Sequence, residues 1–161
     1  MKKIVTINQA VRIAKVLHLR GKNITLIGGC FDILHIGHIK FIREAEKLGG
    51  KLFIFLEPDE KVSLLKGNER PVFSQKERAE MLSSLISVAY IIKLPVLKNN
   101  ADYDDLIKKL QPDVIAVTDN DPLIALKKNQ AEKSGGKLIV LPFHKSLSSS
   151  KIAEILKEEH L

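Results

Sequence analysis

Short apolar runs alternate with helical patterns along nearly the whole chain, and this alternation constrains the fold more than any other feature. Between the runs, apolar residues recur every three to five positions, as they do on one face of a helix. Strands that alternate with helices form βαβ crossovers and therefore a parallel sheet. We expect α/β architecture: a single Rossmann-like domain over residues 1–161, with a five-stranded parallel sheet flanked by helices. The five expected strands are 24–27, 52–56, 88–92, 114–117 and 138–141.

Turn and capping residues give the expected limits of the other elements. An amphipathic segment forms an N-terminal helical extension at about residues 1–21, and a helix from His35 ends at the glycine pair after Leu48. Residues 57–73 are expected to be a polar loop. Ser74-Gln75-Lys76-Glu77 is typical of a capping box and starts the next helix. The later helices are expected to start at Asp102, around Pro122 and at Ser148.

The composition limits the compartment and the partners. The single cysteine, Cys30, excludes an internal disulfide and fits a reducing, cytoplasmic compartment. No apolar run approaches the ~20 residues that a membrane span needs, so no membrane partner is expected. The net charge of +7 is spread along the chain, and aromatic residues are only 5% of it. This pattern disfavours nucleic acid and leaves a polyanionic small molecule as the expected partner.

The segment after the first expected strand, 28–38, is the most unusual in the chain. Ligands of open parallel sheets bind beyond the carboxyl ends of the strands, which is where this segment lies. His35 and His38 are three residues apart at a helix start, so both imidazoles share one face beside free backbone amides. Gly37 lets a phosphate approach the backbone.

A single histidine in a protein is usually packed and hydrogen-bonded, but the pair of His35 and His38 favours stabilisation of a phosphoryl transition state. A zinc site is disfavoured because only Cys30 and Asp32 lie near.

Two further clusters contain groups that bind phosphate. Lys66, beside Gly67, can reach over a triphosphate, although lysines of loops are commonly just solvated. Arg70 follows in the same loop, and Arg78 lies in the helix after it. Ser148, Ser149 and Ser150 begin the last helix, where serine is a common cap and where the backbone amides favour an anion.

These segments together resemble the cytidylyltransferase-like nucleotidyltransferases. The family pattern Gly-x-Phe-Asp-x-x-His-x-Gly-His occurs here as Gly29-Cys30-Phe31-Asp32-Ile33-Leu34-His35-Ile36-Gly37-His38. Within the superfamily, Leu65-Lys66-Gly67 and Arg70-Pro71-Val72 are similar to the heptose 1-phosphate adenylyltransferases. Gly37-His38-Ile39-Lys40 and the serine run with Lys151-Ile152 are similar to the glycerol-3-phosphate cytidylyltransferases.

The resemblance implies an enzyme that transfers a nucleoside monophosphate from an NTP, ATP being favoured, to a phosphorylated sugar or polyol and releases pyrophosphate. It implies Mg²⁺ brought in with the NTP, no metal site of the protein's own, and a possible homodimer. The implied catalytic residues are His35, His38 and Lys66. The implied nucleotide-binding residues are Gly29, Cys30, Phe31, Gly37, His38, Arg78, Ser148, Ser149 and Ser150. Candidate acceptor-binding residues are Asp32, Lys40, Arg70 and Asp119.

The sequence departs from the family pattern at three places, all in segments that recognise the nucleotide base or the acceptor and not in the segments that carry out the transfer reaction. Gly28 stands where the adenylyltransferases have Asn, and 117–121 replaces their Lys-Gly-Gly-Asp-Tyr stretch. The stretch 143–147 lacks the arginine of the cytidylyltransferases. Two alternatives therefore stay open: a CTP-dependent enzyme acting on a polyol phosphate such as glycerol 3-phosphate, and a catalytically idle nucleotide-binding module.

Overall fold

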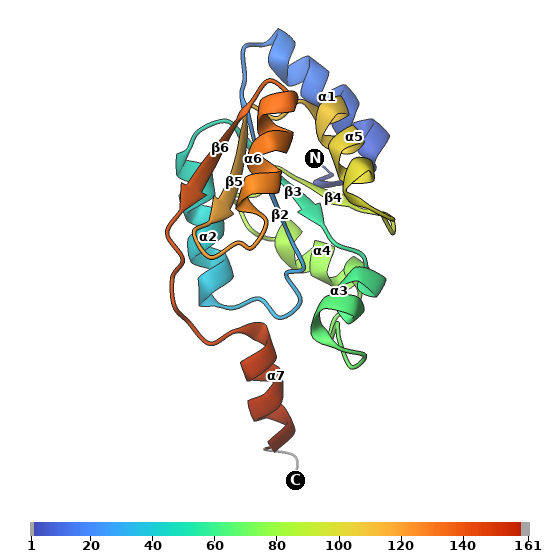
Figure 1. Ribbon diagram of the computed structural model, residues 1–161, viewed down its shortest axis with the longest axis vertical. Helices are drawn as coiled ribbons and strands as arrows, with labels where there is room; N and C mark the ends of the chain where they lie inside the picture. Colours follow the sequence, from blue (N-terminus) through green and yellow to red (C-terminus); the bar gives the residue numbers. More distant parts are fainter. Residues whose placement is uncertain (1, 159–161) are drawn as a thin grey trace.

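The computed structural model describes residues 2–158 and contains one twisted sheet with helices on both faces (Figure 1). All of its strand pairs are parallel. The strands of the described part are β1 Ile4–Val5, β2 Ile24–Gly29, β3 Lys51–Leu56, β4 Tyr90–Lys93, β5 Val114–Thr118 and β6 Lys137–Leu141. The helices are α1 Ile7–Leu19, α2 Ile36–Lys47, α3 Asp59–Lys66, α4 Gln75–Ser83, α5 Asn100–Leu110, α6 Ile124–Lys133 and α7 Ser149–Glu158.

The predicted α/β fold with a parallel sheet is confirmed, but the sheet has six strands rather than five. The missed strand is β1, in which Ile4 pairs with Ile91 and Val5 with Ile92. A two-residue strand followed at once by a helix leaves no periodicity in the sequence to read. Its pairing comes from β4, whose Ile91 N–H donates to the Lys3 carbonyl at 2.9 Å.

The middle strands are buried on both faces, as their continuous apolar sequences predict. In β3, Phe53 and Phe55 face a core shared with α1, α5 and α6, whereas Ile54 and Leu56 face a second core shared with α2 and α4. The segment expected to be an N-terminal extension places Ala10 and Ala14 of α1 in the first of these cores. The result is a sheet between two helical layers.

The expected boundaries of several elements differ from the structure, including the strand expected at 88–92, which is β4 at Tyr90–Lys93. The segment 57–73, expected to be a loop, contains α3, whose Leu64 and Leu65 are exposed and hide its helical pattern. The cap of α5 is Asn99 rather than Asp102, because the Asn99 side chain accepts from both Ala101 and Asp102 N–H. Pro122 precedes α6 instead of lying inside it, and β2 continues through Gly28 and Gly29.

The strand order β1-β4-β3-β2-β5-β6 places the chain reversal between β2 and β5. From β2 the chain proceeds outward through β3 and β4, and it then returns to the other side of β2 to form β5 and β6. Helices on either side of such a switch point separate at the carboxyl ends of the strands and leave a crevice there. This topology fixes where a ligand site is expected.

Candidate active site

A cleft of about 320 Å³ opens at this switch point, beyond the carboxyl ends of β2 and β5. Residues of the family motif line it together with Lys66 and two of the three serines. Its lining comprises Gly28, Gly29, Cys30, Phe31, His35, Gly37, His38, Phe41, Lys66, Ala116, Val117, Thr118, Asp121, Lys127, Pro142, Phe143, His144, Ser146, Ser148 and Ser149.

His35 and His38 form the N-terminal cap of α2. The Gly37 N–H donates to His35 Nδ1 at 3.1 Å, and the His35 N–H donates to His38 Nδ1 at 3.4 Å. The two rings lie 3.9 Å apart between centroids, so they share one face as the spacing predicts. Because His35 Nδ1 accepts a hydrogen bond, the neutral ring carries its proton on Nε2. The cap therefore leaves an N–H donor on a ring that lines the cleft.

Both imidazoles favour the neutral form. Burial, with the nearby charges of His35 and Lys66, lowers the pKa of His38 to about 3. Burial and the Lys66 ammonium also lower the pKa of His35. At neutral pH the pair consists of uncharged hydrogen-bond donors, which suits stabilisation of developing oxyanion charge better than proton transfer at physiological pH.

Two glycines of the motif are required by close packing. A Cβ at Gly37 would lie 2.5 Å from Ser146 Oγ and 2.9 Å from His35 Cε1. A Cβ at Gly29 would lie 2.9 Å from the Phe31 ring, which is buried, with a backbone φ of 46°. Side chains at either position would displace the groups that form the cleft wall. At Gly28, by contrast, a Cβ would meet only ordinary contacts with Phe55 at 3.7–3.8 Å.

The structure brings Lys66 and the serine cluster together although 83 positions separate Lys66 from Ser149. Lys66 Nζ donates to Ser149 Oγ at 2.8 Å, and Arg70 Nη1 donates to Ser150 Oγ at 3.3 Å. Burial lowers the pKa of Lys66. Ser148 Oγ accepts from the Lys151 N–H at 3.2 Å and so caps α7. The Lys66 ammonium and the N-terminus of α7 therefore lie together at one edge of the cleft, where both could bind a polyphosphate.

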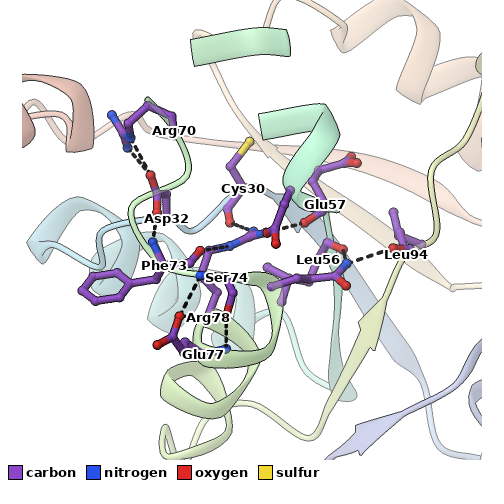
Figure 2. Close-up of polar contacts among 12 residues, drawn as sticks. Cys30, Asp32, Leu56, Glu57, Arg70, Phe73, Ser74, Glu77, Arg78 and Leu94 are labelled. Atoms are coloured by element: carbon purple, nitrogen blue, oxygen red, sulfur yellow. Dashed lines mark hydrogen bonds and ion pairs between the residues drawn. The ribbon is translucent and has the colours of Figure 1, made fainter. Parts of the chain in front are cut away.

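Asp32, which was expected to bind the acceptor, lies outside the cleft lining and is occupied by other residues. Its side chain is fully buried, and it accepts from the Val72 and Phe73 N–H groups and from Arg70 Nε at 2.6 Å (Figure 2). Burial alone would raise the pKa of Asp32, but these backbone and side-chain hydrogen bonds lower it. A carboxylate so occupied anchors the segment 70–73 against the family motif instead of binding a substrate.

Arg78, which was expected among the nucleotide-binding residues, lies behind the cleft lining. Its side chain is 0% exposed and lies at the centre of Figure 2. It donates to the carbonyl oxygens of Cys30, Glu57 and Phe73, and it forms an ion pair with Asp59 at 2.6 Å. Arg78 thus supports the cleft from behind by fixing the backbone of Cys30.

Two other expected residues lie outside the cleft lining. Lys40 is exposed on α2, and the Asp119 carboxylate accepts from the Phe143 N–H at 3.2 Å. Cys30 does line the cleft, and burial raises the pKa of its thiol. A protonated thiol is a poor nucleophile, so the side chain of Cys30 is not suited to covalent catalysis.

Several lining residues on the far side of the cleft were not predicted from the sequence motifs. Asp121 and Lys127 form an ion pair at 2.6 Å there, next to Thr118 and Phe143. The segments that follow β5 and β6 lie beyond the carboxyl ends of these strands, where ligands of parallel sheets bind. No spacing or residue pattern, however, distinguished these side chains from ordinary loop residues.

The chain belongs to the cytidylyltransferase-like family. The model of that family, described as "Cytidylyltransferase-like", matches residues 26–158, which include the motif, Lys66 and the serine cluster. The predicted family and the predicted class of enzyme, a nucleotidyltransferase, are thereby confirmed.

Several curated relatives are named bifunctional protein HldE. The protein of a Nitratiruptor species is 42% identical over 103 residues, which cover 64% of this chain and 21% of the relative. That of Geotalea uraniireducens is 33% identical over 159 residues, which cover 96% of this chain and 31% of the relative. The chain therefore corresponds to a fifth to a third of these relatives.

Two solved structures share the fold. A lipopolysaccharide core biosynthesis protein from Thermoplasma volcanium superposes with a TM-score of 0.62 at 26% identity, covering 78% of this chain and 99% of that one. A pantoate-beta-alanine ligase from Francisella tularensis superposes with a TM-score of 0.68 at 14% identity, covering 100% and 79%. The second likeness concerns the fold alone.

Two features of residues 2–158 bear on metals and membranes. Among these residues, no group of three histidine, cysteine, aspartate or glutamate side chains is arranged to hold a metal ion. None of the helices described is long and apolar enough to span a bilayer.

Proposed function

We propose that this nucleotidyltransferase transfers adenylate from ATP to a phosphorylated sugar or polyol, such as heptose 1-phosphate, and releases pyrophosphate. The observation that carries the proposal is the paired cap of α2. Its two neutral imidazoles line the cleft within one rigid turn, with Lys66 and Ser149 on the same cleft. The preference for a sugar phosphate rests on the similarity of the segments at Lys66 and Arg70 to the heptose 1-phosphate adenylyltransferases.

In this mechanism the residues bind and orient, and none forms a bond with the substrate. An oxygen of the acceptor phosphate attacks the α-phosphorus, the new P–O bond forms, and the bond to the β-phosphate oxygen breaks. His35 and His38 donate to the α-phosphate oxygens, whose charge grows in the transition state. Lys66 and the amides at the start of α7 hold the β- and γ-phosphates that leave as pyrophosphate.

The acceptor needs no general base, because a phosphate monoester is already ionised at neutral pH. This agrees with the low pKa of His38, which would make it a weak base. Mg²⁺ would accompany the NTP, since phosphate oxygens are ligands that this ion prefers. It would neutralise charge on the leaving pyrophosphate.

Pyrophosphate release measured across the four NTPs and a panel of phosphorylated acceptors tests the proposal. We expect release with ATP that depends on a sugar 1-phosphate, and little release with the other NTPs. A preference for CTP with glycerol 3-phosphate would contradict the proposed substrates but would leave the proposed reaction, nucleotidyl transfer with release of pyrophosphate, unchanged. Binding of NTP with no release for any acceptor would identify an idle nucleotide-binding module.

A further inference from the structure

The polar side-chain contacts of the helix α7 with other elements come from one segment, 66–70, among the residues described. In Figure 1 it projects away from the body of the molecule. Within residues 2–158, the polar side-chain contacts that join it to other elements are those of Lys66 with Ser149, Arg70 with Ser150, and Glu69 with Lys157. The helix α7 and the segment 66–70 therefore lie opposite each other. They are joined by the Lys66 and Arg70 contacts at the start of the helix, the inner end, and by the Glu69–Lys157 ion pair at the other end, the outer end.

Between α7 and the segment 66–70 lies a second cavity, of about 670 Å³, which the mechanism above does not use. Ile33, Val72, Ala153 and Leu156 give it apolar sides, and Asn68 and Glu154 are polar groups of its lining. Lys66 lines both this cavity and the first cleft, and the adjacent residues Ser149 and Ser150 line one each. The two spaces are thus neighbours separated by the lysine and the start of α7.

Arg70 marks the inner end of the second cavity with unused hydrogen-bonding capacity. Its side chain is 7% exposed, and its Nε donates to Asp32 Oδ2 at 2.6 Å. Its Nη2 forms an ion pair with the same oxygen at 2.5 Å and meets hydrogen-bond geometry with none of the described residues. Its Nη1 makes only the 3.3 Å contact with Ser150, which also lines the second cavity, so an acceptor oxygen of a ligand would meet this edge of the guanidinium.

We propose that this second cavity is the acceptor site, and that it binds a phosphorylated polyhydroxy compound with its phosphate against Arg70 and Lys66. An arginine beside a lysine is a strong phosphate-binding pair. The carbon skeleton would lie along Ile33, Val72 and Leu156, and its hydroxyls would pair with Asn68 and Glu154. The inference rests on the proposed function, since it assigns the acceptor of that same reaction.

The position of Lys66 explains how the two substrates would meet. An acceptor phosphate held at the Lys66 end of the second cavity is next to the cleft that contains His35 and His38. Attack on the α-phosphorus then needs no movement of the acceptor across the protein, which is the advantage of fixed proximity. The acceptor would enter past the Glu69–Lys157 ion pair at the outer end of the cavity.

A charge placed on the apolar wall tests the site by kinetics. Leu156 is 49% exposed on α7, so Leu156→Asp should leave the fold intact, as judged by an unchanged Tm. We expect the KM for heptose 1-phosphate to rise by about tenfold or more, because a carboxylate would replace the apolar side chain that contacts the carbon skeleton and would add a like charge to a cavity that binds an anion. ATP affinity in the absence of acceptor should be unchanged. The matched control, Leu19→Asp, changes an 88% exposed leucine of α1 and should leave both values unchanged. An unchanged acceptor KM in Leu156→Asp would overturn the assignment.

Binding without turnover separates this inference from the proposed function. Heptose 1-phosphate added to methyl-labelled protein should shift the NMR signals of Ile33, Val72 and Leu156 but not that of Leu19. Shifts confined to Ala116 and Val117 of the first cleft, or no shifts at all, would reject the second cavity as the acceptor site. If the expected shifts appear but ATP yields no pyrophosphate, the proposed reaction fails while the sugar-phosphate site stands.

Discussion

The starts of α2 and α7 are both helix N-termini that line the same cleft, but they are held in place in opposite ways. The first is capped by its own two histidines and backed by the buried side chains of Asp32 and Arg78. The second is held by the tips of two long cationic side chains from one segment. In the proposed mechanism, the turn where charge would develop is therefore fixed before substrate binds, whereas the region that would hold the leaving and attacking phosphates is expected to adapt to them.

The largest effect is expected from removing a donor from the fixed region. His35→Ala and His38→Ala should each lower kcat by about 100- to 1000-fold while changing ATP affinity little, because such donors act mainly on transition-state charge. Steady-state kinetics and a separate measurement of ATP binding would check this. The control, His18→Ala, removes an imidazole that contacts Asp113 at the opposite end of the sheet. Activity within about threefold of wild type in both active-site variants would contradict the assignment.

The support behind the fixed region should matter for stability. Arg78→Met leaves the buried carbonyl oxygens of Cys30, Glu57 and Phe73 without a donor. We expect the free energy of unfolding to fall by about 3 kcal/mol, measured by urea denaturation. Arg43→Met, at an exposed position of α2, is the control and should change stability by less than about 0.5 kcal/mol. A loss below about 1 kcal/mol in Arg78→Met would show that the start of α2 does not depend on this arginine.

The burial of His38 predicts a dependence of stability on pH. Its pKa is lowered to about 3 in the folded protein, whereas an unfolded histidine titrates near about 6.5. Between these values only the unfolded chain binds the proton, so the folded state loses stability as pH falls from about 6.5 toward 3. His38→Gln lacks this loss and should gain stability relative to wild type between about pH 7.5 and pH 4.5, by at most about 1.4 kcal/mol per pH unit. An equal difference in unfolding free energy at both pH values would argue against a buried neutral imidazole.

The smallest effect, and the sharpest test of the adaptable region, is expected in hydrogen exchange. Peptides covering 57–73 should exchange faster than those of α4 in the free protein and should slow when ATP binds. Lys66→Ala and Ser149→Ala should each weaken the ATP-dependent slowing, because both side chains would contact the triphosphate. Lys76→Ala, exposed on α4, serves as the control. If ATP leaves exchange of 57–73 unchanged in the wild-type protein, Lys66 is a solvated surface residue.

The difference between locally held and distantly held groups also determines which parts of the site could be predicted from the sequence. The pairing of His35 with His38 was predictable, because it depends on a three-residue spacing at a helix start and on local caps. The role of Arg78 was not, because its acceptors at Cys30 and Glu57 lie 48 and 21 positions away, and their proximity arises only from tertiary folding. The second cavity was equally hidden, since it depends on where α7 lies relative to Arg70.

Elements with weak periodic patterns were missed for a different reason. The position of β1 is determined by its pairing with β4. In α3, Val62 is the one apolar residue that is buried, so the helix has no apolar face that a periodic pattern could reveal. Asp121 and Lys127 were missed because an ion pair between residues six positions apart has no distinctive spacing in the sequence. Patterns in sequence report local structure well, and contacts between distant segments poorly.

The cap formed by His35 also bears on how this site can change during evolution. The Nδ1 atom of His35 caps the start of α2, and in the proposed mechanism its Nε2 atom donates to the substrate, so loss of this histidine would remove a structural and a chemical contribution together. Asn, Asp or Ser at position 35 would restore the cap but not the donor. In homologues that have lost the reaction, position 35 is therefore expected to be Asn, Asp or Ser more often than other residues. A homologue with such a residue at this position, and with the glycines still in place, would be a descendant that has kept the fold and lost the activity.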